Sequence, residues 1–190
     1  MEIKIVTATP AMAPQIASLI MEAMNHECCQ NFAGEHHTLD DFHRMMTRLV
    51  GMDDSQYSYR NTLVAIAPDG SLAGICVAYD GGKLHTLRQR FVEAAREAFN
   101  IDYSGMADET SEGEYYVDSL CVDNAFRGKG IATRLLQAAT VRARELGIPA
   151  VGLLVDKGNP KAEKLYQRVG FRYVNDTAWG GHAMRHLQYR

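Results

Sequence analysis

The feature that most constrains the fold is an alternation of strand-like and helix-like segments over residues 115–170. Apolar, β-branched runs at 115–122 and 150–156 have the length of buried strands, and a segment with helical spacing follows each one. Gly147 and Gly170 end these helical segments, and Asn159 begins the second one before Pro160. Strands interleaved with helices predict an α/β architecture in which helices are layered against a sheet.

The flanking segments extend this pattern without a linker or an internal repeat. A Thr38 hydroxyl can cap the helix that Gly51 ends, and Pro-Asp-Gly joins two strands into a hairpin. The predicted elements are strands at 2–8, 61–67, 71–79, 171–176 and 182–189, and helices at 13–25, 39–50 and 83–100. A chain of 190 residues can bury one core, so we expect one domain, residues 1–190.

Charge and apolar patterning exclude several classes of protein. The net charge of −3 does not favour nucleic acid or an anionic membrane as a partner. No apolar run approaches the roughly 20 residues of a membrane span, and the start lacks the pattern of a signal peptide. The four cysteines, with Cys28 next to Cys29, do not form a disulfide framework. We therefore expect a soluble, cytoplasmic protein.

The stretch AFRGKGIATRLL, residues 125–136, places two glycines and two cations between a strand and a helix. Such a turn exposes backbone N–H groups at the positive end of the helix dipole, where a phosphate can bind. Gly128 and Gly130 allow close approach because they lack a Cβ atom. A Walker loop is excluded because Asp123 stands at its first glycine position, and Thr133 replaces the third glycine of a Rossmann fingerprint.

Two motifs in this region belong together. Arg127, Gly130 and Ala132 form an Arg-x-x-Gly-x-Ala pattern, and NPKAEKLYQRVGF follows at residues 159–171. With both motifs in this order, residues 114–174 resemble the GNAT superfamily of N-acetyltransferases. The resemblance implies a mixed, mostly antiparallel sheet, splayed between the strands at 115–122 and 150–156 and flanked by helices. The segment at about 83–112 is then an inserted helix and acidic loop before the central strand.

The same resemblance implies acetyl-CoA as the co-substrate and no metal. The pantetheine arm would pair with the strand at 115–122, and the pyrophosphate would lie on the glycine turn. The implied coenzyme-binding residues are Leu120, Cys121, Val122, Arg127, Gly128, Lys129, Gly130, Ile131, Ala132, Asn159 and Tyr166. The implied reaction is direct transfer of an acetyl group to a primary amine within a ternary complex.

That reaction needs a base for the amine, a donor for the oxyanion and a proton for the thiolate. Family members often carry an acidic residue on the central strand, which implies Asp118 as the base, with Glu114, acting through water, as the alternative. Tyr166 matches the tyrosine that protonates the thiolate, and a backbone N–H near Leu120 or Cys121 would hold the oxyanion. Period-two alternation gives the strand one face with Glu114, Tyr116, Asp118, Leu120 and Val122 and another with Tyr115, Val117, Ser119 and Cys121.

Each of these residues also has a plainer interpretation. Asn159 can serve only as a helix cap, Tyr166 lies on the apolar stripe of its helix, and Asp118 can pair with an arginine. Cys121 is a small buried hydrophobe rather than a nucleophile. A zinc site in HECCQNFAGEHH is disfavoured because its spacing does not match structural zinc patterns; its candidate ligands are His26, Cys28, Cys29, His36 and His37.

The acceptor and the class of protein stay open at this point. We expect residues 26–37 and the inserted helix and loop to line the acceptor side, with Asp102, Asp108, Glu109 or Glu112 able to meet a cationic amine. A polyamine, an aminoglycoside-like drug, an amino acid and a protein amine all fit as acceptors, and a homodimer is plausible by resemblance. A non-catalytic CoA-binding sensor is the alternative to an enzyme, and a nucleotide-binding protein of another fold is a third hypothesis.

Overall fold

The computed structural model describes residues 2–190 and contains a seven-stranded sheet; Met1, which the single-domain prediction includes, lies outside the described residues. The strand order is β1-β2-β3-β4-β5-β7-β6, and every neighbouring pair is antiparallel except β4 with β5. The expected mixed, mostly antiparallel sheet is therefore confirmed. The strands are β1 (Lys4–Thr7), β2 (Thr62–Ile66), β3 (Leu72–Asp80), β4 (Glu114–Val122), β5 (Ala150–Asp156), β6 (Arg172–Trp179) and β7 (His182–Tyr189).

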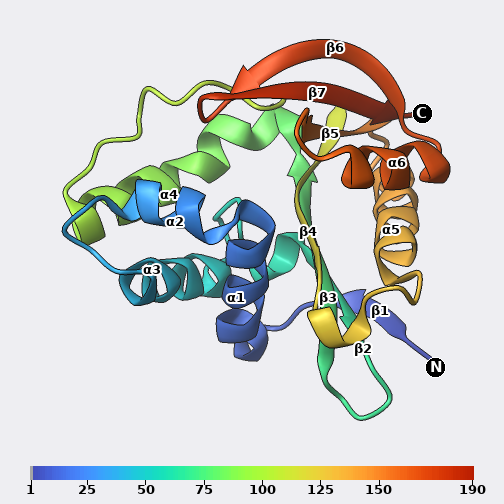
Figure 1. Cartoon of the computed structure of the whole chain (residues 1–190), viewed down its shortest axis with the longest axis horizontal. Helices are drawn as coiled ribbons and strands as arrows, with labels where there is room; N and C mark the ends of the chain where they lie inside the picture. Colours follow the sequence, from blue (N-terminus) through green and yellow to red (C-terminus); the bar gives the residue numbers. More distant parts are fainter. Residues whose placement is uncertain (1) are drawn as a thin grey trace.

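Helices cover both faces of the sheet (Figure 1). The first four helices lie to one side, and α5 and α6 lie to the other. The predicted insert is present as α4, directly before β4. The helices are α1 (Ala13–Met24), α2 (His26–Ala33), α3 (Leu39–Gly51), α4 (Leu84–Phe99), α5 (Ile131–Glu145) and α6 (Pro160–Val169). Within residues 2–190, none of them combines the length and the apolar character needed to cross a membrane.

Side-chain caps explain where α2 and α3 begin. At α3, the Thr38 hydroxyl accepts a hydrogen bond from the Asp41 N–H at 3.2 Å, and the Asp41 carboxylate accepts one from the Thr38 N–H at 2.8 Å. The helix predicted after Thr38 is thus confirmed. Helix α2 was not predicted from the sequence. Asn25, with φ of 67°, ends the helical path of α1, and its side chain accepts a hydrogen bond from the Cys28 N–H at 2.8 Å, which caps α2.

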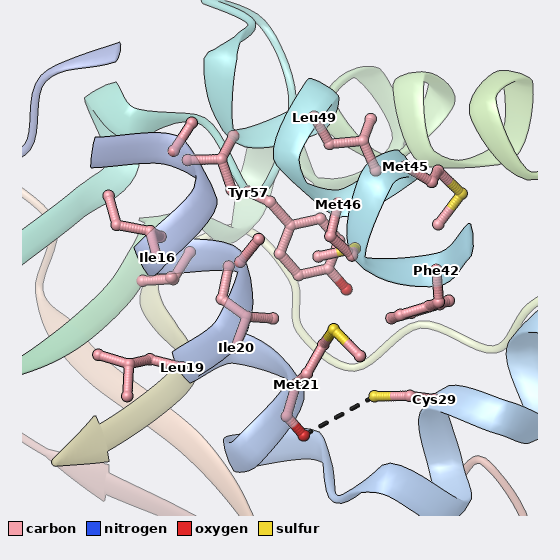
Figure 2. Packing of buried hydrophobic residues seen from close by; sticks show 14 of the residues in the cluster. Ile16, Leu19, Ile20, Met21, Cys29, Phe42, Met45, Met46, Leu49 and Tyr57 are labelled. Carbon is pink, nitrogen blue, oxygen red and sulfur yellow. Dashed lines mark hydrogen bonds between the residues drawn. The ribbon is translucent and has the colours of Figure 1, made fainter. Parts of the chain in front are cut away.

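The larger hydrophobic core lies between the first four helices and the sheet. Figure 2 shows Ile20 and Met21 of α1 facing Met46 of α3, with the Tyr57 ring between the two helices. The Cys29 thiol of α2 donates to the Met21 carbonyl at 3.7 Å, which ties α2 to α1. Burial of each large side chain stabilises the fold by about 1.5–3 kcal/mol. This core therefore holds Tyr57 rigidly where it reaches the cavity described below.

The strict alternation predicted for the central strand is wrong beyond its midpoint. Val117 of β4 pairs with Ala78 of β3, whereas Ser119 pairs with Val77, so Asp118 has no partner on β3. Between these two pairs, β4 therefore contains one residue more than β3, and this extra residue makes a β-bulge.

The bulge inverts the faces of β4 for the residues that follow it. Val117 and Leu120, predicted on opposite faces, contact the same core on the α5 side, and Cys121 faces the helices α1 to α3. An inserted residue has this effect because side chains alternate with a period of two. The bulge carries Asp118, the predicted base.

Candidate active site

The parallel strands β4 and β5 separate at the centre of the sheet. Their pairing extends only from Glu114–Ala150 to Tyr116–Gly152. Beyond this point, β4 borders two hollows that share lining residues: a cavity of about 270 Å³ beside Asp118 and a groove of about 580 Å³ beside the glycine turn. We name them the acceptor cavity and the coenzyme groove, after the roles that the sequence resemblance implies. The residues that line both hollows are Ala23, Leu120, Asn159, Ala162 and Tyr166.

The glycine turn forms an open cradle at the start of α5. Gly128 and Gly130 have φ values of 75° and 73°, which side chains other than glycine rarely adopt, and no other group lies within 4 Å of the Cβ position of either residue. Arg127 Nε donates to the Val122 carbonyl at 3.1 Å, and Lys129 Nζ donates to the Ala125 carbonyl at 3.2 Å. The turn therefore offers bare backbone at a helix N-terminus, as phosphate binding requires.

The coenzyme groove gathers almost every residue that the sequence assigned to the coenzyme. Lys129 is the exception, since it does not line the groove. The predicted residues that line it are Leu120, Cys121, Val122, Arg127, Gly128, Gly130, Ile131, Ala132, Asn159 and Tyr166. Lys161 and Arg168 of α6 also line the groove and add two cations that were not among the predicted residues. Both residues lie in the motif at 159–171, and their positive charge is the feature of the sequence that could have indicated contact with a phosphate.

Asp118 projects from the bulge into the acceptor cavity. Burial, followed by the negative charge of Glu109, raises the pKa of Asp118 to about 7. The carboxylate lies 3.0 Å from the Ser119 hydroxyl, 3.2 Å from the Tyr79 hydroxyl and 3.3 Å from Gln56 Nε2, and each donor favours the ionised form while it points to this carboxylate. The group can therefore both take up and release a proton near neutral pH.

Glu114 lies outside both hollows, at the point where β4 and β5 are still paired. Its carboxylate accepts hydrogen bonds from Thr110 Oγ1 at 2.8 Å, His186 Nε2 at 2.6 Å and Gln188 Nε2 at 2.7 Å. We call these four side chains the Glu114 clasp. Burial works to raise the pKa of Glu114, but the hydrogen bonds from His186, Gln188 and Thr110 outweigh it and lower the pKa.

The clasp passes over β5 to reach β7, which is possible only because Gly152 has no side chain. A Cβ atom at Gly152 would overlap the Glu114 carboxyl group. Glu114 thereby links β4, β7 and the loop before β4 at the position where the strands begin to separate.

Tyr166 and Asn159 lie where the two hollows meet. Burial, with a smaller contribution from the Cys76 thiol, raises the pKa of Tyr166 to about 12, so this phenol stays protonated at neutral pH. The Asn159 side chain accepts a hydrogen bond from the Ala162 N–H at 3.2 Å. Asn159 is therefore a helix cap, as its plainer interpretation predicts, and it also lines the cavity.

Of the four insert carboxylates, only Glu109 lines the acceptor cavity. Glu109 is 7% exposed and pairs with Arg88 of α4, which is 5% exposed. Asp108 pairs with Arg88 at 3.3 Å, and Asp102 pairs with Arg96 at 2.9 Å. The insert thus contributes one carboxylate to the cavity and fixes it with a buried guanidinium.

The β6–β7 hairpin forms a wall of the cavity that the sequence analysis missed. It forms the edge of the sheet beside β5 and extends towards α2 and α4 (Figure 1), and Trp179, His182 and Met184 line the cavity. The Trp179 ring lies 6.2 Å from the Phe32 ring of α2, and His182 Nδ1 lies 3.3 Å from Asp156. The sequence Trp179-Gly-Gly indicates a turn between two strands, but it does not indicate that the Trp179 ring contacts Phe32.

The cysteine- and histidine-rich segment at 26–37 supplies Cys28 to the cavity wall. Across residues 2–190, the structure gathers no group of three or more His, Cys, Asp or Glu side chains that could hold a metal ion. The four cysteines are free thiols.

Comparison with known proteins agrees with the geometry. The model of the Acetyltransferase (GNAT) family matches residues 26–171. The chloroplastic GCN5-related N-acetyltransferase 4 of Arabidopsis thaliana is 30% identical over 192 residues, which cover 90% of this chain and 65% of that protein, so the chain spans about two thirds of its length.

Solved structures share the fold over nearly the whole chain. A crystal structure named only as an acetyltransferase has a TM-score of 0.80 at 29% identity, and the match covers 97% of each chain. An N-acetyltransferase from Staphylococcus aureus Mu50 has a TM-score of 0.79 at 23% identity, over 98% of this chain and 100% of that one. The second likeness concerns the fold alone.

Proposed function

Because the chain belongs to the GNAT family of acetyltransferases, we propose that it transfers an acetyl group from acetyl-CoA to a primary amine, directly and within a ternary complex. The observation that carries this proposal is that the two hollows lie side by side and share lining residues. A phosphate cradle opens into one, a carboxyl group that titrates near neutral pH projects into the other, and Tyr166 lines both.

In this proposal, the coenzyme lies in the groove between β4 and α6. The N–H groups of the glycine turn hold the pyrophosphate, and Arg127, Lys161 and Arg168 add positive charge. The edge of β4 beyond Tyr116 has no paired strand on the β5 side, so its backbone groups are available to the pantetheine amides. Acetyl-CoA supplies the thioester that the amine attacks.

The reacting groups follow from the cavity. Amines have pKa values near 10 in water, so the acceptor arrives as an ammonium ion and must lose a proton before it attacks. Asp118 accepts that proton, a backbone N–H near Leu120 or Cys121 stabilises the oxyanion, and Tyr166 gives its proton to the departing thiolate. Glu114 has three hydrogen-bond donors and does not line the cavity, so we assign it a structural role.

The walls of the acceptor cavity favour a small cationic amine. Tyr57, Tyr116 and Trp179 contribute aromatic faces that attract cations, and Glu109 and Asp156 contribute negative charge beside Asp118. These residues come from five parts of the chain. A substitution at any of these positions should therefore change which acceptor binds and leave the coenzyme groove unchanged.

The first test is calorimetric titration of the purified chain with acetyl-CoA, CoA, ATP and NAD. We expect both CoA species to bind, ATP and NAD to bind far more weakly, and the double variant Gly128→Val with Gly130→Val to lose binding. Gly70→Val is the matched control, because Gly70 also has a positive φ and open space around it but lies in the β2–β3 turn. Absence of CoA binding would contradict the proposal.

The second test separates an enzyme from a CoA-binding sensor. A panel of diamines and amino acids is assayed for CoA release with the parent and with Asp118→Asn. Turnover that Asp118→Asn abolishes while coenzyme binding persists supports the enzyme. Binding without turnover on any acceptor supports the sensor.

A further inference from the structure

Tyr79 faces two carboxylates with a single hydroxyl group. Its oxygen lies 3.2 Å from Asp118 Oδ2 and 3.2 Å from Glu109 Oε1. Burial, followed by the charges of Asp118 and Glu109, raises the pKa of Tyr79 well above its usual value, so the hydroxyl keeps its hydrogen. One hydrogen cannot serve both acceptors at once, which leaves one carboxylate without this donor whenever both are ionised.

Glu109 is the carboxylate of the two that is paired with a cation. Its other oxygen pairs with Arg88, whose guanidinium is buried and also donates to the Met106 and Ala107 carbonyls at 3.0 Å each. Removing the charge of Glu109 would leave a buried guanidinium partly uncompensated, which is unfavourable. Asp118 has no such cation within hydrogen-bonding distance and relies on neutral donors.

We propose that Tyr79 and Glu109 form a hydrogen-bonded relay with Asp118, in which the Tyr79 hydroxyl turns to Glu109 whenever Asp118 carries the proton taken from the acceptor amine. In that state Asp118 Oδ2–H donates to Tyr79 Oη, and Tyr79 O–H donates to Glu109 Oε1. The only bonds that change are the N–H bond of the ammonium ion, which breaks, and the O–H bond of Asp118, which forms. In the protonated state the Tyr79 hydroxyl both accepts and donates a hydrogen bond, whereas in the ionised state one of the two carboxylates goes without this donor.

Tyr79 and Glu109 are therefore positioning residues that set the pKa of Asp118. The role of Asp118 as the base of the reaction rests on the proposed function. A tyrosine that only donated to Asp118 would favour the ionised carboxylate and lower its pKa. The relay predicts the opposite sign, because Tyr79 is fully used only when Asp118 is protonated. The groups that face Asp118 or share its cavity are Gln56, Tyr57, Tyr79, Glu109, Tyr116 and Ser119, with Cys28, Asp156 and His182 in the cavity walls.

The test is a pH titration of the full chain labelled with ¹³C at the aspartate carboxyl, followed by NMR, with Asp118→Asn to identify the Asp118 signal. Tyr79→Phe removes the hydroxyl, and Glu109→Gln removes the charge while keeping the shape. Glu112→Gln is the control, because Glu112 is exposed on the same loop and does not line the cavity.

We expect the Asp118 midpoint to fall by roughly one unit in both Tyr79→Phe and Glu109→Gln and to stay unchanged in Glu112→Gln. A midpoint that rises or stays in Tyr79→Phe overturns the relay, as does an unchanged midpoint in Glu109→Gln. If Glu109→Gln fails to fold, Tyr79→Phe decides alone, because the two models predict opposite signs for it.

The titration needs neither coenzyme nor acceptor, which separates the relay from the proposed function. A chain with no acetyl transfer but with both expected shifts would contradict the proposed function alone. In an active chain, the acidic limb of the kcat/KM profile should move to lower pH in Tyr79→Phe, and an unmoved limb would contradict the relay alone.

Discussion

Replacing Gly152 by alanine tests the Glu114 clasp directly. The new Cβ atom would overlap the Glu114 carboxyl group. The backbones cannot separate to relieve this overlap, because Gly152 of β5 pairs with Tyr116 of β4 on one side and with Gln188 of β7 on the other. Glu114 must therefore leave the side chains of Thr110, His186 and Gln188.

The expected loss of stability follows from those contacts. Hydrogen bonds to a charged group contribute about 1.5–3 kcal/mol each, and disrupting a buried ionic contact costs about 3–5 kcal/mol. Because His186 and Gln188 are only partly buried, water replaces part of what they lose. We expect the free energy of unfolding of Gly152→Ala to fall by about 3–5 kcal/mol and the Tm to fall by roughly 6–20 °C. Urea and thermal denaturation measure both.

A double-mutant cycle identifies the cause. In a Glu114→Ala background the overlap is gone, and Gly152→Ala should be neutral or stabilising by about 0.4–1 kcal/mol, because alanine restricts the unfolded chain. Gly51→Ala is the control, since no other group lies within 4 Å of its Cβ position. Equal destabilisation by Gly152→Ala in both backgrounds would refute the clasp.

Three further predictions concern other parts of the site and fold. Because the folded state raises the pKa of Asp118 to about 7, folding binds protons between about pH 4 and 7, and this group lowers stability as pH rises through that window. Asp118→Asn should therefore be more stable than the parent at pH 8 by roughly 2–4 kcal/mol and closer to it at pH 4, as urea denaturation at both values would show. Trp179→Ala should raise the acceptor KM several-fold while the Kd for acetyl-CoA stays the same, because Trp179 lines the acceptor cavity and not the groove; a changed Kd in calorimetry would contradict this division. Thr38→Ala should reduce the free energy of unfolding by about 1 kcal/mol through loss of the α3 cap, whereas the exposed Ser104→Ala should not.

Much of the fold could be predicted because local signals agree with tertiary structure. Gly147 and Gly170 end helices with positive φ, and Asn159 with Pro160 begins α6, as the sequence indicates. Thr38 caps α3 in the same way. In each case one residue type suits one backbone conformation, so no knowledge of distant segments is needed.

The bulge could not be predicted from β4 alone. Its position depends on the register against β3, where Val77 and Ala78 meet Ser119 and Val117. Asp118 and Ser119 are polar residues inside an otherwise mostly apolar run, but nothing in the sequence of residues 114–122 marks either of them as the unpaired one. The inverted faces of Leu120 and Cys121 follow from that tertiary pairing.

The site shows the same division. The glycine turn and the motif at 159–171 lie in two short segments, and most of the coenzyme groove could be predicted from them. The acceptor cavity instead combines Tyr57, Glu109 and Trp179, which lie far apart in the chain. Their approach depends on the core between α1 and α3, on the buried Arg88 and on the hairpin, so no local pattern reports it.

The place of the β6–β7 hairpin in the chain has a consequence for synthesis. Every residue of the coenzyme groove lies between 22 and 168, so the ribosome has made all of them before it makes the hairpin. The wall of the acceptor cavity is incomplete until residues 179–184 have been made. Strand β5 likewise lacks its antiparallel neighbour until β7 has been made. Synthesis therefore supplies every residue of the proposed donor site before the hairpin that completes the proposed acceptor site.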